Sequence, residues 1–336
     1  MRIALIGCQN HWTTYAAVLK DLPEARVVAV ALGAPTEKLE TFAAAPGVTA
    51  ETARFDDPRR MLDQIQPDLV NVATALECGG RWNLECARRG VPFATEKPLA
   101  FTLDELAQIW EASARQAVPL YPIQGMLGVP AFHAAHEAVK AGRIGKPLAS
   151  YHQKSYRWGE RPDSYKDRRT FPGLVPWVGI HALAWMQWIL GDIFEEASGW
   201  EGVEARPAYA ACASQAGMIF RQAQGGYALL SLDYLRPAAA PTHGDERLRI
   251  AGTQGVVEIA GPQSACVLTT SREGPREIQP AAAPLDPYTQ FARSLRKEAA
   301  PPISRYDAFR VTELAFLAQR AVETGQPVAL RPSRFA

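Results

Sequence analysis

Short, continuous apolar runs alternate with amphipathic segments over the first third of the chain. The apolar runs are rich in Val, Ile, Leu and Ala, and they span residues 2–7, 25–33, 68–74, 91–98 and 118–125. Between them, apolar residues recur at helical spacing in 13–22, 61–67, 81–90 and 102–116. Strands without a polar face that are joined by helices predict a parallel sheet covered on both sides. We therefore expect one α/β domain over residues 1–125.

The pattern changes after residue 125. Longer segments of alternating polar and apolar residues follow, several of them joined by Gly-containing turns, at 148–158, 213–222, 226–235, 247–261 and 265–271. Such alternation predicts antiparallel strands with one covered face. Helical segments accompany them at 131–142, 286–298 and 304–325. We expect a second, α+β domain over residues 126–336, and two domains suit a chain of 336 residues.

Local signals in the first domain predict where one helix begins and where another ends. Thr102 and, three residues later, Glu105 form the pattern of a capping box before the helix at 102–116. Gly90 stands where a helix that ends in the left-handed conformation favours glycine.

Composition and charge narrow the classes of function. The chain has 36 Lys and Arg against 35 Asp and Glu, a formal net charge of +1, which argues against broad binding to nucleic acid or anionic membranes. No apolar run has the length of a membrane helix, and the chain enters a strand at once without the pattern of a signal peptide. The five cysteines form no Cys-x-x-Cys pair, which predicts reduced thiols in a cytoplasmic protein. We expect no metal site.

The segment FATEKPLAFT, residues 93–102, places charged residues where a buried strand is predicted to end. In an open parallel sheet, ligands bind beyond the carboxyl ends of the strands, and Glu96 and Lys97 are expected there. Pro98 disfavours the α conformation for Lys97, and the bond between them is a candidate for the cis form. The alternative interpretation is a solvent-exposed ion pair at a strand end.

Several motifs together resemble the Gfo/Idh/MocA oxidoreductases. They are IALIG at 3–7, TEKPLAFTLDEL at 95–106, AGRIGKPLA at 141–149, PWVGIHALAWMQWILG at 176–191, IAGTQGVVEI at 250–259 and AVETGQPVAL at 321–330. The resemblance covers nearly the whole chain. It implies a Rossmann domain followed by an α/β domain whose large, mostly antiparallel sheet often forms dimers. Members typically oxidise or reduce a hydroxyl of a sugar or cyclitol with NAD or NADP.

The resemblance assigns the chemistry to Lys97 and His181. Lys97 matches the family lysine that contacts the nicotinamide ribose and the reacting hydroxyl. His181, in PWVGIH, matches the histidine that acts as acid/base or holds that hydroxyl. These residue types suit the roles, because an imidazole titrates near neutral pH and an ammonium group stabilises a developing alkoxide. The alternative for His181 is a structural histidine at the start of a helix.

The expected cofactor contacts follow the predicted strands. The glycine-rich loop of the family is replaced by the sequence GCQNHW at 7–12, in which only the first glycine is kept and Trp12 is bulky where a small residue is usual. Asn10 tolerates the left-handed conformation, and backbone N–H groups there could still bind phosphate. The expected set is Gly7, Gln9, Asn10, His11, Trp12, Leu32, Thr74, Glu96 and Lys97.

Three further positions depart from the family pattern. The acidic residue that binds the adenosine ribose is missing near Ala31 to Gly33, and no Arg replaces it, so the choice between NAD and NADP stays open. The segment TALECG keeps Thr74 but loses the Pro and His that usually follow. Trp177 stands four residues before His181, where the family commonly has Asp. A Trp there could stack on a sugar face or fill the pocket.

The segment 151–173 is crowded with Tyr, Trp, Arg, Lys and Asp. Aromatic rings could lie under a sugar, and Arg or Lys could bind hydroxyls or a carboxylate. The alternative is an exposed strand followed by a loop of mixed charge. The expected substrate-binding residues are Lys97, Tyr156, Trp158, Tyr165, Lys166, Trp177 and His181.

Three functions remain open on these observations. The first is an NAD(P)-dependent dehydrogenase or reductase that acts on a sugar-like small molecule. The second is a redox-inactive relative that binds a sugar-like ligand or a partner protein. The third is a glycosidase or lyase that uses NAD transiently. A wide antiparallel sheet with few helices to cover it predicts a homodimer or homotetramer.

Overall fold

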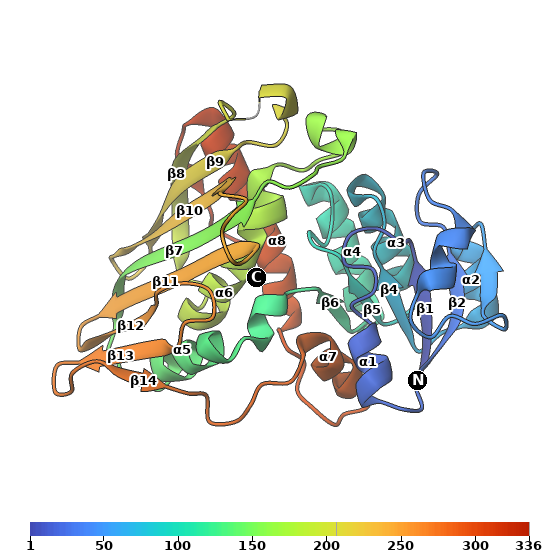
Figure 1. The fold of residues 1–336 in the computed structure, drawn as a ribbon, viewed down its shortest axis with the longest axis horizontal. Helices are drawn as coiled ribbons and strands as arrows, with labels where there is room; N and C mark the ends of the chain where they lie inside the picture. The colour runs from blue at the N-terminus through green and yellow to red at the C-terminus, as the bar shows by residue number, and fades with distance from the viewer. Residues whose placement is uncertain (206, 336) are drawn as a thin grey trace. The chain divides into compact units, whose positions relative to one another are not determined.

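A computed structural model describes residues 1–205 and 207–335. The chain divides into two compact units, which are coloured along the chain in Figure 1. Unit 1 contains residues 1–124, 285–312 and 335, and unit 2 contains residues 125–284 and 313–334. This division is not contiguous, unlike the expected one at residue 125, because helix α7 (Pro287–Leu295) packs against helix α1 (Ala16–Asp21) in unit 1.

Unit 1 is built on a parallel sheet of six strands. The strands are β1 (Arg2–Ile6), β2 (Arg26–Ala31), β3 (Ala53–Phe55), β4 (Leu69–Val72), β5 (Phe93–Thr95) and β6 (Leu120–Pro122). Their order is β3-β2-β1-β4-β5-β6, and all neighbouring pairs are parallel. The predicted parallel sheet is therefore confirmed. The strand order reverses at β1 and β4, and ligands of such sheets bind at this reversal, beyond the carboxyl ends of the strands.

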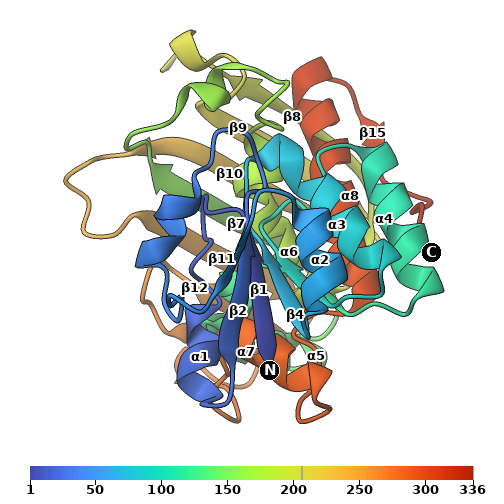
Figure 2. The same ribbon diagram turned by 90° about the vertical axis from the view of Figure 1, so that its right-hand side faces the viewer.

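Helices cover both faces of this sheet. Figure 2 shows α2 (Pro58–Ile65), α3 (Leu76–Arg88) and α4 (Leu103–Arg115) on one side, and α1 and α7 on the other. A 3₁₀ segment, η1 (Leu39–Ala44), follows β2. The side chains of β1, β4 and β5 are almost all buried, as expected for strands covered on both faces.

The structure confirms the predicted helix ends in unit 1. The hydroxyl of Thr102 accepts a hydrogen bond from the N–H of Glu105 at 3.1 Å, and the Glu105 carboxylate accepts one from the N–H of Phe101 at 2.7 Å. Gly90 has φ +72° directly after the end of α3. Three predicted starts were wrong. Helix α1 begins at Ala16 rather than residue 13, after a series of turns, and α2 begins at Pro58 rather than residue 61, because Asp57 caps it. Helix α3 begins at Leu76 rather than residue 81.

Unit 2 contains a sheet of nine strands. They are β7 (Pro147–Arg157), β8 (Phe194–Gly202), β9 (Gln215–Gln222), β10 (Tyr227–Arg236), β11 (Gly244–Gly252), β12 (Gly255–Ile259), β13 (Cys266–Thr270), β14 (Arg276–Ile278) and β15 (Val328–Ala329). The order is β14-β13-β12-β11-β7-β10-β9-β8-β15. All pairs are antiparallel except β7 with β10, which is parallel. The prediction of a large, mostly antiparallel sheet is confirmed.

Helices cover one face of this sheet. Figure 1 shows α5 (Pro130–Lys140) and α6 (Ile180–Leu190) along that face. Shorter turns, η2 (Gly125–Gly128), η3 (Asp163–Lys166), η5 (Pro207–Tyr209) and the π-helical η4 (Val175–Gly179), complete the unit. Helix α8 (Arg305–Thr324) contributes residues 305–312 to unit 1 and the rest to unit 2. No helix among the described residues is both long enough and apolar enough to cross a membrane.

No helix formed by residues 1–205 and 207–335 covers the opposite face of the nine-stranded sheet, and we call it the open face. Strand register places two rows of side chains across it. One row is Arg249, Tyr151, Leu229, Ile219 and Ser198, and the next is Arg247, Gln153, Ser231, Gly217 and Trp200. Trp200 is 70% exposed, and Ile219 and Leu229 are exposed as well. Large apolar side chains therefore lie in contact with solvent in the middle of this face.

Candidate active site

The carboxylate of Glu96 is the centre of the candidate site in unit 1. It follows β5 directly and is almost fully buried. One oxygen, Oε2, accepts hydrogen bonds from the backbone N–H of His11 at 3.1 Å and from the imidazole Nδ1 of His11 at 2.7 Å. The other, Oε1, accepts the N–H of Lys97 at 3.0 Å. Glu96 therefore connects the loop after β1 to the loop after β5.

The charge of Glu96 is held in place by these partners. Burial alone would raise the pKa of this carboxyl, but the hydrogen bonds from His11 and the charge of Lys97 outweigh it and lower the pKa below its usual value. The carboxylate is therefore ionised at neutral pH.

Lys97 is buried, and this excludes the alternative of a solvent-exposed ion pair. Its side chain is 3% exposed, and its Nζ lies 4.0 Å from Oε1 of Glu96. The bond between Lys97 and Pro98 is cis, as the sequence suggested. A buried ammonium group has a restricted position, and this suits a group that must stand beside one reacting oxygen.

The loop from Gly7 to Trp12 begins with a conformation that requires glycine. Gly7 has φ +84°, and a Cβ there would lie 2.5 Å from the carbonyl oxygen of Ala73. The N–H of Gln9 donates to that same carbonyl, and Asn10 is left-handed with φ +54°, as its residue type allows. The chain thus turns tightly over the end of β4 before it enters the turns that lead to α1.

Trp12 is the bulky residue of this loop, at a position where a small residue is usual. It packs edge-on against Phe42 of η1, with 5.8 Å between ring centroids. Its backbone carbonyl accepts a hydrogen bond from Asn71 at 3.1 Å. The N–H of His11 is engaged by Glu96, so this one backbone donor is already used within the protein.

No acidic residue stands at Ala31 to Gly33, as the sequence shows, but a carboxylate from the following turn reaches the end of β2. Glu37, 7% exposed, folds back so that its Oε2 accepts the N–H groups of Gly33 at 2.7 Å and Ala34 at 3.2 Å. Its Oε1 accepts the hydroxyl of Thr74 at 2.6 Å. The sequence search missed Glu37 because it stands several residues beyond the strand end and reaches it only through the turn. Leu32 directly follows β2 and donates its N–H to Phe55.

These residues fit a dinucleotide. The strand order, the glycine turn at the end of β1 and the carboxylate at the end of β2 are the features by which this fold binds pyrophosphate and ribose. Gly7 to His11 would face the pyrophosphate, Leu32 to Glu37 would face the adenosine side, and Glu96 and Lys97 would lie near the nicotinamide end.

His181 and Trp177 lie on one continuous helical segment of unit 2. Trp177 is in the π-helical turn η4 and His181 in the first turn of α6. Trp177 is buried, and its ring is edge-on to Tyr165 at 6.2 Å and to Phe171 at 6.4 Å. The rings of Tyr165 and Phe171 are stacked at 4.2 Å. Trp177 therefore fills space among aromatic rings, and His181 is half-buried beside it along the chain.

Three predicted substrate residues, Tyr156 of β7, Trp158 just after it and Tyr165 of η3, belong to a group of rings. We call this group the aromatic cluster: Tyr156, Trp158, Tyr165, Tyr209 and Tyr234. Trp158 is edge-on to Tyr209 at 5.1 Å and to Tyr234 at 5.2 Å, and Tyr156 lies 6.2 Å from Tyr234. Lys166 is more peripheral, because it is exposed, paired with Asp163 at 2.7 Å and 5.1 Å from the Tyr209 ring.

Charged residues that the sequence did not single out accompany this cluster. The guanidinium of Arg161 lies 4.8 Å from the Tyr234 ring, 5.7 Å from Tyr165 and 5.9 Å from Trp158. Lys154 Nζ lies 2.5 Å from Glu246 and 4.6 Å from the Tyr156 ring. The sequence could have indicated Lys154, because the alternation along β7 places residues 152, 154 and 156 on one face of the strand.

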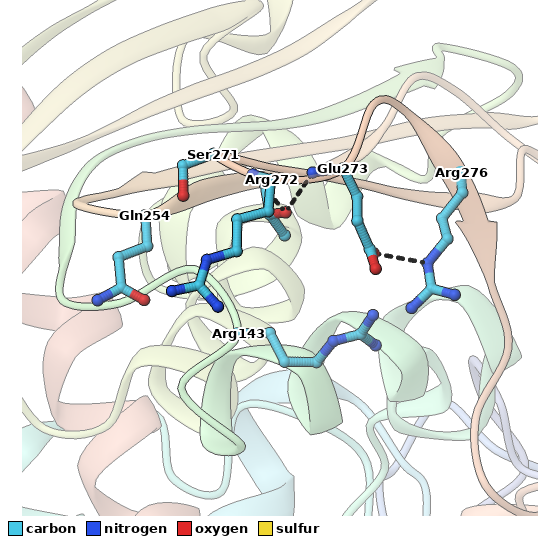
Figure 3. Close-up of a pocket in the computed structure, with 7 residues that line it drawn as sticks. Arg143, Gln254, Ser271, Arg272, Glu273 and Arg276 are labelled. Carbon is cyan, nitrogen blue, oxygen red and sulfur yellow. Dashed lines mark hydrogen bonds and ion pairs between the residues drawn. The ribbon is translucent and has the colours of Figure 1, made fainter.

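Two cavities of unit 2 differ in character. One, of about 310 Å³, is bordered by Glu246 and by mainly apolar groups such as Met126, Phe132 and Ile259. The other, of about 550 Å³, is shown in Figure 3 and is lined by Arg143, Arg272 and Arg276 with Glu273, which pairs with Arg276 at 3.5 Å. Its side chains are largely exposed and lie around β13 and β14. In the sheet, strands β11 and β12 separate β13 and β14 from β7, the strand that carries Tyr156 of the aromatic cluster.

The described residues contain no group of three or more His, Cys, Asp and Glu side chains arranged to hold a metal ion.

Comparison with known proteins identifies the family. The model of an oxidoreductase family with an NAD-binding Rossmann fold, GFO/IDH/MocA, matches residues 1–123, and the model of the GFO/IDH/MocA C-terminal domain matches residues 132–258. This chain is a GFO/IDH/MocA oxidoreductase. Its unit 1 is accordingly the family's NAD-binding domain.

Individual relatives agree with this assignment. A solved structure of a "putative oxidoreductase" from Thermotoga maritima is 31% identical and superposes with a TM-score of 0.89, covering 98% of this chain and 100% of that one. Myo-inositol 2-dehydrogenase of Thermotoga maritima is 24% identical over 340 residues, 98% of each chain. Inositol 2-dehydrogenase 2 of Saccharopolyspora erythraea is 31% identical over 200 residues, which are 57% of this chain and 54% of that relative, so this match spans about half the relative's length.

Proposed function

We propose that the protein is an NAD-dependent dehydrogenase that oxidises a hydroxyl of a sugar, sugar derivative or cyclitol, or reduces the corresponding carbonyl. The observation that carries this proposal is the buried Lys97, held by Glu96 at the carboxyl end of β5 in an NAD-binding domain. Relatives named as inositol dehydrogenases support a substrate that is rich in hydroxyl groups.

Lys97 and His181 have different roles at the reacting hydroxyl. NAD, when bound, supplies a hydride acceptor. The ammonium group of Lys97 stabilises negative charge on the substrate oxygen as its proton leaves. The imidazole of His181 receives that proton and returns it in the reverse direction. Trp177 supplies no carboxylate, so His181 works here without the acidic neighbour that is common in the family.

Glu37 favours NAD over NADP. A carboxylate at the end of β2 repels the 2′-phosphate that distinguishes NADP. Both oxygens of Glu37 already accept hydrogen bonds from Gly33, Ala34 and Thr74. These donors partly neutralise the carboxylate and weaken its repulsion of a phosphate. The expected preference for NAD is therefore below about 100-fold, or roughly 2.7 kcal/mol.

The open face supports assembly into a homodimer or homotetramer. Solvent-exposed Trp200, Ile219 and Leu229 on a wide sheet are the kind of surface that a second copy covers. The five cysteines are all free thiols, which suits a protein of the reducing cytoplasm.

The proposed function is tested by a dehydrogenase screen over aldoses, uronates, aminosugars and inositols with NAD and NADP, followed through absorbance of the reduced nucleotide. Net formation of NADH with at least one class supports the proposal. A titration with NADH and NADPH, followed by fluorescence, measures cofactor binding independently. No binding of either nucleotide would support a redox-inactive protein, and product release without net NADH would support transient oxidation by a glycosidase or lyase.

A further inference from the structure

Positive charge exceeds negative charge around the aromatic cluster of unit 2. Burial lowers the pKa of His243, and the charges of Arg161, Arg157 and Lys154 lower it further, while Glu246 is the carboxylate that acts in the opposite sense. Glu246 is itself paired with Lys154 at 2.5 Å. Once that pair is formed, the charge of Arg161 remains uncompensated at this place.

Arg161 differs in its partners from Arg236 and Arg247, two arginines of the neighbouring strands. Arg236 and Arg247 both pair with Asp245, at 3.1 and 2.9 Å. Among the described residues, Arg161 has no ion pair within 4.0 Å. Its contacts are three aromatic rings and one long hydrogen bond of 3.4 Å, from Nη2 to the carbonyl of Arg157. Its Nε is buried without a hydrogen-bond partner.

Packing against rings explains only part of this arrangement. Contact with aromatic faces stabilises a guanidinium by about 0.5–2 kcal/mol. A buried N–H donor without a partner costs about 1–3 kcal/mol, so a side chain kept only for packing would lose about as much as it gains. An acceptor supplied by a ligand removes that cost. The rings also fix the orientation of the guanidinium plane, so the group is already positioned to bind a planar partner.

We propose that Arg161 binds a carboxylate of the substrate, and that the substrate is an acidic sugar, such as a uronic or aldonic acid. This inference rests on the proposed dehydrogenase function and narrows its substrate class. A carboxylate matches a guanidinium in a planar, two-bonded arrangement. Tyr156 and Trp158 in the same cluster are half-buried and can border the apolar side of a sugar ring, whereas Tyr234 is buried.

The test compares pairs of sugars that differ only in the acidic group. D-glucuronate is compared with D-glucose and D-galacturonate with D-galactose, and D-glucose 6-phosphate provides a phosphate in place of the carboxylate. For the wild type we expect kcat/KM to be at least about 10-fold higher for the acid than for its neutral counterpart, because a charge-assisted pair contributes on this scale. In Arg161→Gln this ratio should fall to near one, mainly through a higher KM for the acid. Arg161→Lys should keep part of the ratio.

The matched control is Arg276→Gln, which removes an arginine from the exposed pocket of Figure 3 and should leave the ratio unchanged. A wild type that prefers the neutral sugars overturns the inference, and so does an Arg161→Gln variant in which both members of a pair lose activity in equal proportion. Preference for D-glucose 6-phosphate over D-glucuronate overturns the assignment of a carboxylate.

Binding without turnover separates this inference from the function on which it rests. D-glucuronate and D-glucose are titrated calorimetrically into the wild type and into Arg161→Gln in the absence of nucleotide. Binding of D-glucuronate that depends on Arg161, without NADH formation in the screen, upholds the acidic-sugar site and rejects the dehydrogenase proposal. Turnover of neutral sugars alone upholds the dehydrogenase and rejects the acidic-sugar site.

Discussion

Lys97 is the side chain on which the proposed chemistry depends most directly. Lys97→Met removes the ammonium group beside the reacting oxygen, so we expect kcat to fall by at least about 100-fold. Because Lys97 is buried beside Glu96, the variant should also lose stability, by about 1–3 kcal/mol, rather than fold with its stability unchanged as an exposed pair would allow. Steady-state kinetics on the substrate from the screen and urea denaturation measure the two effects.

Two variants decide whether the loss comes from chemistry. Lys97→Arg keeps the positive charge but not the position of Nζ, so it should recover more stability than turnover. His181→Ala should lower kcat by a factor similar to Lys97→Met, and the double variant by less than the product, because both groups serve one proton transfer. Full activity in Lys97→Met on a confirmed substrate would reject the assigned role.

Glu96 makes the stability of unit 1 depend on pH. A carboxyl group with a lowered pKa contributes stability that is fully present above the pKa of the unfolded chain, about 4.3, and that disappears as the pH falls through the lower folded value. Glu96→Gln removes this contribution, so it should be less stable than the wild type at pH 7. The difference, measured by urea denaturation, should narrow below about pH 4. A difference that stays constant from pH 7 to pH 3 would contradict this account.

The sequence predicted part of the residue-scale arrangement. Lys97, its cis bond to Pro98 and the left-handed Asn10 follow from local rules about proline and asparagine. Two of the hydrogen bonds to the Glu96 carboxylate come from His11, 85 residues away along the chain, and no local pattern reports them. Glu37 was missed because it reaches the end of β2 only through a turn, and Arg161 because one of the rings beside it, Tyr234, lies on β10, far along the chain.

Gly7 controls the passage from β1 into the nucleotide loop. Gly7→Ala would place a Cβ 2.5 Å from the Ala73 carbonyl and from the Thr74 Cβ, at φ +84°, so the loop must shift. We expect a loss of stability of about 1–3 kcal/mol and at least a 10-fold weaker binding of NADH, measured by thermal unfolding and fluorescence titration. The control is Gly79→Ala in α3, where a Cβ meets nothing within 4 Å; it should stabilise by about 0.5–1 kcal/mol. Equal effects of the two substitutions would contradict the close approach.

Element types were predicted well where a segment was long and periodic. The strands β7, β9 and β10 and the helices α4 and α8 followed from their alternation or helical spacing. The segment expected at 247–261 forms two strands, β11 and β12, and the nine-residue strand β8 was not expected. The short strands β3, β14 and β15 have two or three residues, too few to show a period, and they form because neighbouring strands offer free edges. The parallel pairing of β7 with β10 is a property of topology, since sequence alternation does not report direction.

At the scale of the whole molecule, the open face should determine assembly. We expect a wild-type homo-oligomer at micromolar concentration, with copies packed sheet on sheet and each interface above roughly 1,000 Å² in total. Trp200→Glu and Ile219→Glu place charges among the apolar side chains of this face and should shift the protein toward monomers, because a buried unpaired charge is costly. Sedimentation velocity measures the distribution of species. The control is Leu285→Glu, which changes an exposed apolar residue of similar size in unit 1, away from the strands of the sheet, and should leave the oligomer intact. A monomeric wild type, or equal dissociation by all three variants, would show that the open face is not the interface.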